Sequence, residues 1–244
     1  MESDGLGGLC LEKLDWDSEQ LGLSAGLVAN EALIARYPAP DVFDRIRAIL
    51  AQKPEISFIT FKIPDSCTDI VNMLVRGPAD FIDTELIYRF SGPVGKSSAC
   101  QVIFTEQWQG EEFVPLASEM RWSRFFLDKR IAAAKADGLW RTSIANHCQG
   151  RADQLAVALL DGQPAGLVVI TAAGGEKALF LVGVLPEYQG RGIGTALLKA
   201  VTDRYGATAP LYVETSSRNL AANRLYQKAG FVLHRTRYIL HCIR

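Results

Sequence analysis

Three glycines stand at alternate positions where an apolar run gives way to the spacing of a helix. They are Gly190, Gly192 and Gly194, within VLPEYQGRGIGTALL at residues 184–198. Unpaired backbone N–H groups at the start of a helix, together with the helix dipole, favour a bound anion. Because glycine has no Cβ atom, these donors can approach bulky phosphate groups closely. The stretch therefore indicates a binding loop for a pyrophosphate.

Two other interpretations of this loop need to be weighed. A glycine-rich turn kept only for packing is the simpler one. The other is a dinucleotide fingerprint, because Glu214 ends the next strand about 20 residues after Gly194, where a ribose-binding acid would lie. The turn from Leu185 to Gly190 is too long for that fingerprint, and too few residues follow Glu214 to complete a doubly wound sheet. The wider sequence context favours the pyrophosphate loop.

A second glycine-containing stretch, SGPVGKSS at residues 91–98, also resembles a phosphate loop. That motif requires a glycine five positions before Gly95, where this chain has Phe90. The small and turn-forming residues are instead typical of a linker. We therefore predict two domains, residues 1–95 and residues 96–244.

The elements that would position the glycine loop follow from apolar spacing and turn signals. A hairpin is expected around Asp161-Gly162, Pro186 ends the strand before the loop, and Gly206 closes the helix after it. The expected elements are strand 101–106, helical spacing in 113–120 and in 139–148 up to Gly150, strands 155–160, 167–173 and 177–185, helix 193–205, strand 211–215, helix 219–230, and one or two strands in 231–243.

The region around the loop resembles the GNAT superfamily of acetyl-CoA-dependent N-acyltransferases, whose signature is Q/R-x-x-G-x-G/A after a strand ending V-x-P. This chain has Val184-Leu185-Pro186 and then QGRGIG at 189–194. A second family pattern, N-x-x-A-x-x-L-Y-x-x-x-G-F, matches Asn219, Ala222, Leu225, Tyr226, Gly230 and Phe231. The resemblance covers roughly residues 99–244 and implies an α/β GNAT fold, with a mixed, mostly antiparallel central sheet flanked by helices. A smaller α/β domain would precede it.

The resemblance also implies roles for individual residues, with acetyl-CoA as cosubstrate. The strand with Val182 and Val184 would splay from its neighbour and pair with the pantetheine amides, and an N–H near Val184 would face the thioester oxygen. Tyr226 would be the general acid for the departing thiolate, and Asn219 would both cap its helix and contact CoA. The residues assigned to the pyrophosphate are Gln189, Gly190, Arg191, Gly192, Ile193, Gly194 and Thr195. For Arg191, a solvated loop arginine is the equal alternative.

Three stretches resemble pieces of the dTDP-fucosamine acetyltransferase group, which acetylates the amine of a nucleotide-linked deoxyamino sugar. They are LDWDSEQLGL at 14–23, IDTELIYRF at 82–90 and RWSRFFLD at 121–128. The amino-terminal domain would then contribute to the acceptor site. Arg124 could bind the acceptor diphosphate, or form a surface salt bridge. Trp122 and Trp140 could stack on a base or sugar, with core filling as the alternative.

The general base stays open at this stage. Glu214, His147 or a chain of water molecules could take the amine proton, whereas His234 and His241 are expected to be structural. Two other functions also stay open. One is a GNAT enzyme for a peptide, a drug or a polyamine, and the other is a CoA-binding sensor without turnover. The intact Gln189, Gly192, Gly194 and Tyr226 argue against the sensor.

The charge balance and the cysteine content limit the kinds of partner and metal site that we expect. The 26 Lys and Arg residues balance 27 Asp and Glu residues, so no basic field would attract nucleic acid or anionic lipid. An acidic amino terminus and the lack of a long apolar run predict a cytoplasmic protein with no membrane partner. The five cysteines are widely spaced, so we expect buried free thiols and no metal site. A homodimer is left open.

Overall fold

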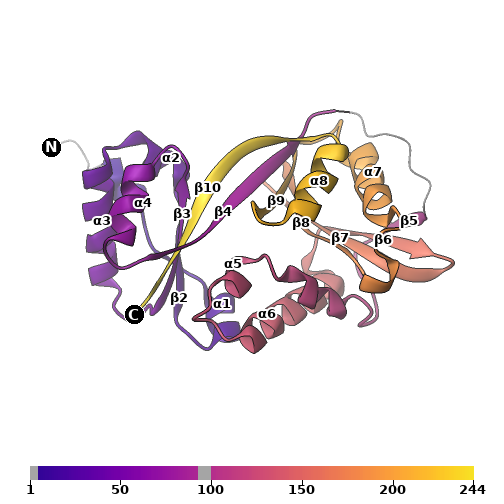
Figure 1. Cartoon of the computed structure of the whole chain (residues 1–244), viewed down its shortest axis with the longest axis horizontal. Coiled ribbons are helices and arrows are strands. Elements are labelled where there is room, and N and C mark those ends of the chain that lie inside the picture. Colours follow the sequence, from indigo (N-terminus) through magenta and orange to yellow (C-terminus); the bar gives the residue numbers. More distant parts are fainter. Residues whose placement is uncertain (1–4, 93–99) are drawn as a thin grey trace. The chain divides into compact units, whose positions relative to one another are not determined.

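The computed structural model describes residues 5–92 and 100–244 (Figure 1). The strands are β1 (Glu12–Lys13), β2 (Ala25–Val28), β3 (Phe58–Pro64), β4 (Asp80–Phe90), β5 (Gln101–Thr105), β6 (Gln154–Leu160), β7 (Gln163–Ala173), β8 (Glu176–Val184), β9 (Leu211–Ser216) and β10 (Phe231–Ile243). The α-helices are α1 (Asp15–Leu21), α2 (Glu31–Arg36), α3 (Ala39–Gln52), α4 (Thr68–Val75), α5 (Arg124–Leu127), α6 (Ala133–Asn146), α7 (Ile193–Tyr205) and α8 (Leu220–Lys228). Short 3-10 helices are η1 (Gly5–Gly8), η2 (Val114–Met120) and η4 (Pro186–Tyr188), and η3 (His147–Arg151) is a π-helical turn.

The chain forms two compact units that are interleaved in sequence. Unit 1 contains Met1–Glu85, Leu127–Lys135 and Thr236–Arg244, and unit 2 contains Leu86–Phe126 and Ala136–Arg235. The long strands β4 and β10 each contribute residues to both units. The predicted boundary at 95–96, and most of the predicted linker at 91–98, lie outside the described residues.

In unit 1, β3 pairs in parallel with β2 and antiparallel with β10. Helices α3 and α4 cover one face of these strands (Figure 1). Apolar residues of α3 recur at helical spacing, and Val42, Ile46 and Ile49 are buried. They pack with Phe61 of β3 and with other apolar side chains in one core cluster. This core is the main source of stability of the unit.

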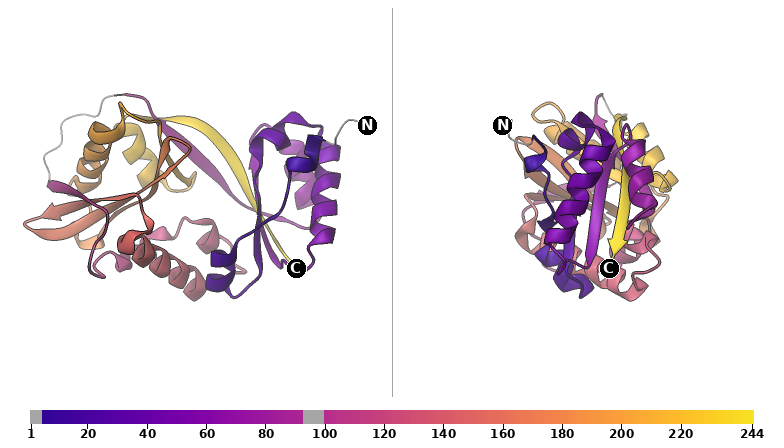
Figure 2. Two further views of the ribbon diagram at one scale, coloured as in Figure 1. Left: turned by 180° about the vertical axis from the view of Figure 1, so that it is seen from behind. Right: turned by 90° about the vertical axis from the view of Figure 1, so that its left-hand side faces the viewer.

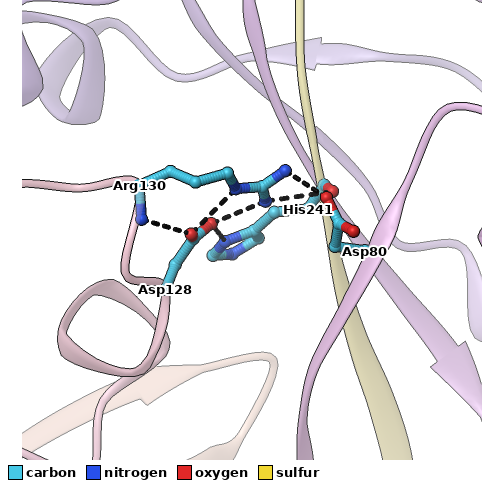
Figure 3. Close-up of polar contacts among 4 residues, drawn as sticks. All are labelled: Asp80, Asp128, Arg130 and His241. Carbon is cyan, nitrogen blue, oxygen red and sulfur yellow. Dashed lines mark hydrogen bonds and ion pairs between the residues drawn. The ribbon is translucent and has the colours of Figure 1, made fainter.

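A buried polar cluster also belongs to unit 1 (Figure 3). The Asp128 carboxylate accepts hydrogen bonds from His241 Nδ1 at 2.9 Å and from Arg130 Nε at 2.9 Å. Arg130 also contacts the exposed Asp80. Asp128 is 3% exposed and His241 is fully buried. Burial opposes ionisation of Asp128, but the hydrogen bonds from His241 and Arg130 outweigh it and hold the pKa of this carboxyl well below its ordinary value.

Unit 2 contains the sheet region β9-β8-β7-β6-β5, with antiparallel pairs except for the parallel pair of β8 and β9. Helices α7 and α8 pack on one face, and α6 and η2 on the other (Figure 2). The β6–β7 turn has positive φ angles at Asp161 (50°) and Gly162 (77°), as its sequence predicts. The predicted α/β fold with a mixed, mostly antiparallel sheet is therefore confirmed.

Three local predictions need correction or refinement. Residues 114–120 form a 3-10 helix: Pro115 has no backbone donor, and the Ser118 hydroxyl bonds its carbonyl at 2.9 Å. Gly206 follows α7 with a φ of −61°, a value that any residue can adopt. A glycine is needed at this position because a Cβ atom there would overlap the Phe90 ring. The final segment is one strand, not two.

All five cysteines are free thiols, as predicted. The expectation that they are buried holds for Cys148 and Cys242 only. Cys67 and Cys100 are partly exposed, and Cys10 is exposed.

Candidate active site

Strand β8 loses one of its two partner strands halfway along its length. It pairs with β9 only at Lys177, Ala178 and Leu179, the last of which lies opposite Val213. On its other side, β8 pairs with β7 as far as Val184. Within the described residues, the β9-facing edge of β8 beyond Leu179 therefore has no strand partner. This is the splay that the sequence comparison implied.

A β-bulge lies at the point where the pairing with β9 ends. Val169 of β7 pairs with Leu181, but the next residue, Ile170, pairs with Leu179. Phe180 is the additional residue. A bulge bends its strand and increases the local twist, which explains why β8 and β9 diverge here.

The backbone direction at the end of β8 follows from one hydrogen bond. The Leu185 N–H donates to the carbonyl of Ala165 in β7 at 3.0 Å. Backbone groups alternate along an antiparallel strand, so those of Val182 and Val184 point away from β7, toward the unpaired edge. The Val184 carbonyl there accepts a hydrogen bond from the Gln189 side chain at 3.2 Å. The edge therefore offers the N–H groups of Val182 and Val184 to an extended ligand.

The glycine loop connects this edge to helix α7. Gly190 and Gly192 have positive φ angles of 76° and 78°, which other residues adopt only with strain. Gly192 is the residue before α7, and the first helical hydrogen bond runs from Ala196 N–H to its carbonyl. The N–H groups of residues 193–195 precede that bond, so they are available to an anion. These features fit a pyrophosphate.

Gly194 also lies at a close contact between two helices. A Cβ at this position would lie 3.1 Å from Leu225 Cδ2 on α8. The missing side chain allows α7 and α8 to pack closely. This packing places the loop beside the helix that carries Tyr226.

Asn219 and Tyr226 lie at the two ends of α8. Asn219 Oδ1 accepts a hydrogen bond from the Ala222 N–H at 3.2 Å, so Asn219 caps the helix as predicted. Tyr226 is 5% exposed and its ring packs near those of Tyr88 and Phe231. Burial raises the pKa of the Tyr226 phenol above its ordinary value. The hydroxyl is therefore a proton donor throughout the neutral range.

The two predicted arginines lie against aromatic rings. The guanidinium of Arg191 is 5.7 Å from the centre of the Tyr188 ring within the glycine loop. The guanidinium of Arg124 is 4.2 Å from the centre of the Phe125 ring and is partly buried. Stacking of this kind restricts the position of a guanidinium group.

The candidate bases differ in exposure. Glu214 directly follows Val213, the last residue of β9 that pairs with β8, and it is exposed. His147 is buried, its Nδ1–H donates to the Ser143 carbonyl at 2.7 Å, and burial lowers its pKa. His234 is exposed near the Tyr212 ring, and His241 is part of the Asp128 cluster of unit 1. Glu214 is thus the exposed candidate that directly follows the last residue of β9 paired with β8.

Sequence reasoning missed Phe180. This residue is 44% exposed, whereas the neighbouring Leu179 and Leu181 are each 3% exposed. His147 stacks on it with ring centres 4.4 Å apart, and Trp140 lies at 6.0 Å. Trp140 itself is held by a hydrogen bond from its Nε1 to Ser123 Oγ at 2.9 Å. A single aromatic residue in the otherwise aliphatic strand KALFLVGVL was the available signal.

Residues 114–231 match the Acetyltransferase (GNAT) family. The matched segment covers just under half of the chain. It contains η2, the splayed strand, the glycine loop and α8 with Tyr226, so the GNAT segment includes every predicted coenzyme-binding residue.

Two curated relatives have similar sequences over part of their length. The spermidine N(1)-acetyltransferase of Escherichia coli K12 is 33% identical over 91 residues, which cover 35% of this chain and 48% of that protein. The [ribosomal protein bS18]-alanine N-acetyltransferase of the same strain is 34% identical over 73 residues, covering 29% of this chain and 49% of that protein. The chain thus spans about half the length of the curated relatives it matches.

A solved structure supports the fold of the chain. The GCN5-related N-acetyltransferase from Sphaerobacter thermophilus aligns with a TM-score of 0.56 and 15% identity, covering 95% of this chain and 75% of that one. In the part of the chain that the structure describes, no three or more His, Cys, Asp or Glu side chains gather to hold a metal ion. Among residues 5–92 and 100–244, no helix has the length and apolar character needed to cross a bilayer.

Proposed function

We propose that the protein is an N-acetyltransferase that moves the acetyl group of acetyl-CoA to a primary amine. The observation that carries this proposal is the unpaired edge of β8 beyond Leu179, which runs directly into the glycine loop. An extended chain with amide groups could pair with that edge while its pyrophosphate meets the N–H groups of residues 193–195. Pantetheine linked to a nucleotide has both parts in this order.

The chain's own groups supply the chemistry of a direct transfer. The Val184 N–H points to the unpaired edge, where it would donate to the thioester oxygen as negative charge develops on it. The attacking amine forms the new C–N bond, and the C–S bond breaks. Tyr226, kept protonated by burial, donates its proton to the departing sulfur. Asn219 and the residues from Gln189 to Thr195 would hold the coenzyme.

Glu214 is the base that the geometry favours. It is exposed on β9 where the splay begins, whereas His147 is buried with its Nδ1 proton directed at Ser143. An amine must lose a proton before or during attack, and an exposed carboxylate can accept it directly or through a water molecule. We assign this role to Glu214.

For the acceptor we propose the amino group of a nucleotide-linked deoxyamino sugar. Phe180 supports this choice, because a ring held by His147 and Trp140 can stack on the flat face of a sugar or base. Arg124, stacked on Phe125, and the 36% exposed Trp122 belong to the segment that resembles the sugar-specific group. Arg124 would bind the diphosphate. The two curated relatives act on spermidine and on a protein alanine, which makes those amines the necessary comparison.

The test is thiol release from acetyl-CoA with three acceptors at matched concentrations. They are a dTDP-linked 4-amino-6-deoxyhexose, spermidine, and a peptide with an amino-terminal alanine. We expect the sugar nucleotide to be acetylated far faster than the other two. A preference for spermidine or the peptide would refute the sugar assignment and keep the acetyltransferase. No amine-dependent release with any acceptor would refute both.

A further inference from the structure

The side-chain amide of Gln189 joins two segments that border the glycine loop. Its Nε2 donates to the Val184 carbonyl at 3.2 Å and to Glu119 Oε2 at 3.3 Å. A backbone carbonyl and an ionised carboxylate can only accept hydrogen bonds, so the amide nitrogen must face them. The Gln189 side chain therefore has one defined orientation. It connects the end of β8 with helix η2.

Glu119 is itself held in place. Its Oε2 lies 3.6 Å from Arg121 Nη2, and its side chain is 27% exposed, compared with 65% for Arg121. Glu119 is therefore the more buried residue of this ion pair. An ion pair this exposed contributes little stability by itself, but it restricts the carboxylate that orients Gln189.

The two hydrogen bonds of the Gln189 side chain hold the first residue of the glycine loop. Gln189 is followed by Gly190, and glycine has more conformational freedom to lose than any other residue. Ordering the loop when the ligand binds would cost conformational entropy. A loop that is already held in place has less of this entropy to lose. The contact with Val184 also fixes the loop relative to the strand whose N–H groups face the unpaired edge. A defined distance between strand and loop suits a ligand that must contact both.

We propose that Glu119 is a positioning residue for coenzyme A, which acts through Gln189 and does not touch the ligand. This inference rests on the proposed function, because it assumes that the glycine loop binds the coenzyme. It assigns to η2, a segment outside both sequence motifs, a role in donor affinity.

The variants separate this role from general stability. Glu119→Ala should weaken CoA binding about three- to tenfold, the effect of one hydrogen bond of ordinary strength, because the contact with Gln189 is exposed and 3.3 Å long. Glu119→Gln keeps an oxygen that can accept from Gln189, so it should restore most of the affinity. Glu111→Ala removes an exposed carboxylate just upstream of the same segment and should leave CoA affinity unchanged. Melting temperatures should stay close to that of the parent in all three.

The deciding experiment is a double-mutant cycle measured by calorimetry with CoA as the ligand. In a Gln189→Ala background, Glu119→Ala should have no further effect on the dissociation constant for CoA, because Glu119 acts only through Gln189. In steady state, Glu119→Ala should raise the KM for acetyl-CoA and leave the acceptor KM unchanged. Independent, additive losses would overturn the inference while the proposed function stands. A parent protein that does not bind CoA would overturn both.

Discussion

Leu179 and Val213 form the last pair between β8 and β9, and the next residue of β8, Phe180, is a bulge. The bulge thus coincides with the opening between the two strands. Strand pairs contribute backbone hydrogen bonds that are lost when strands part. A sheet that opens in its interior leaves donors and acceptors for a ligand to satisfy. The proposed function depends on this opening and on the glycine loop that follows it.

The orientation of Val184 gives a direct test of the oxyanion assignment. Its N–H points away from β7, so Val184→Pro removes the proposed donor without removing a hydrogen bond between β7 and β8. Loss of one such donor costs about 10²- to 10³-fold in kcat. Val184→Ala keeps the N–H and serves as the control. Equal single-turnover rates for the two variants would show that this N–H does not stabilise the oxyanion.

Tyr226→Phe removes only the hydroxyl and keeps the buried ring. We expect a single-turnover rate lower by about 10²- to 10⁴-fold, with little change in CoA affinity or melting temperature. Because burial raises the Tyr226 pKa, this acid stays protonated up to its ordinary range near 10 and beyond, so its ionisation should not reduce activity at pH 9. A rate within about threefold of the parent would mean that water protonates the sulfur and that Tyr226 is structural.

Phe180 should affect the acceptor and not the donor. Phe180→Ala should raise the KM for the amino-sugar nucleotide about five- to tenfold, from the loss of stacking, and leave the KM for acetyl-CoA unchanged. Phe180→Leu is the matched variant, since it keeps apolar bulk at the bulge without a flat ring, and it should be nearly as impaired. An equal rise in both KM values would indicate a distorted strand instead of a lost acceptor contact.

The Asp128 cluster predicts a pH dependence of stability. The folded pKa of Asp128 lies below its ordinary value of 3.8, so its contribution is fully present above pH 5 and is lost as the pH falls below about 4. Asp128→Asn should cost about 3 to 5 kcal/mol of unfolding free energy at pH 7. This difference from the parent should shrink as the pH falls to 3. The matched variant Asp80→Asn, at an exposed position, should cost less than about 1 kcal/mol. Urea unfolding at several pH values measures both.

Local sequence signals predicted the parts of the site that depend on neighbouring residues. Gly190 and Gly192 have the positive φ angles of a tight loop, and Asn219 caps the helix that it begins. Such features are determined within a few residues of chain, because the side chain or its absence acts on its own backbone. The hairpin at Asp161 and Gly162 is another example.

Features that depend on distant partners could not be predicted in this way. The bulge at Phe180 depends on the register between β8 and β7. The packing role of Gly194 depends on Leu225 of another helix. Asp128 and His241 are 113 residues apart and meet only in the folded unit. Apolar periodicity identifies strands and helices, but it does not specify which residues face one another across them.

We propose that coenzyme A lies along the unpaired edge of β8 and on the glycine loop. Backbone amide chemical shifts, followed while CoA is added to the isotope-labelled protein, test it at single residues. We expect saturable changes that are largest for the N–H groups of Val182, Val184 and residues 190–195. Strands β5 and β6, on the far side of β7 from β8, should change little. The claim would be contradicted by saturation with the largest changes outside β8 and the loop, or by no change at millimolar CoA.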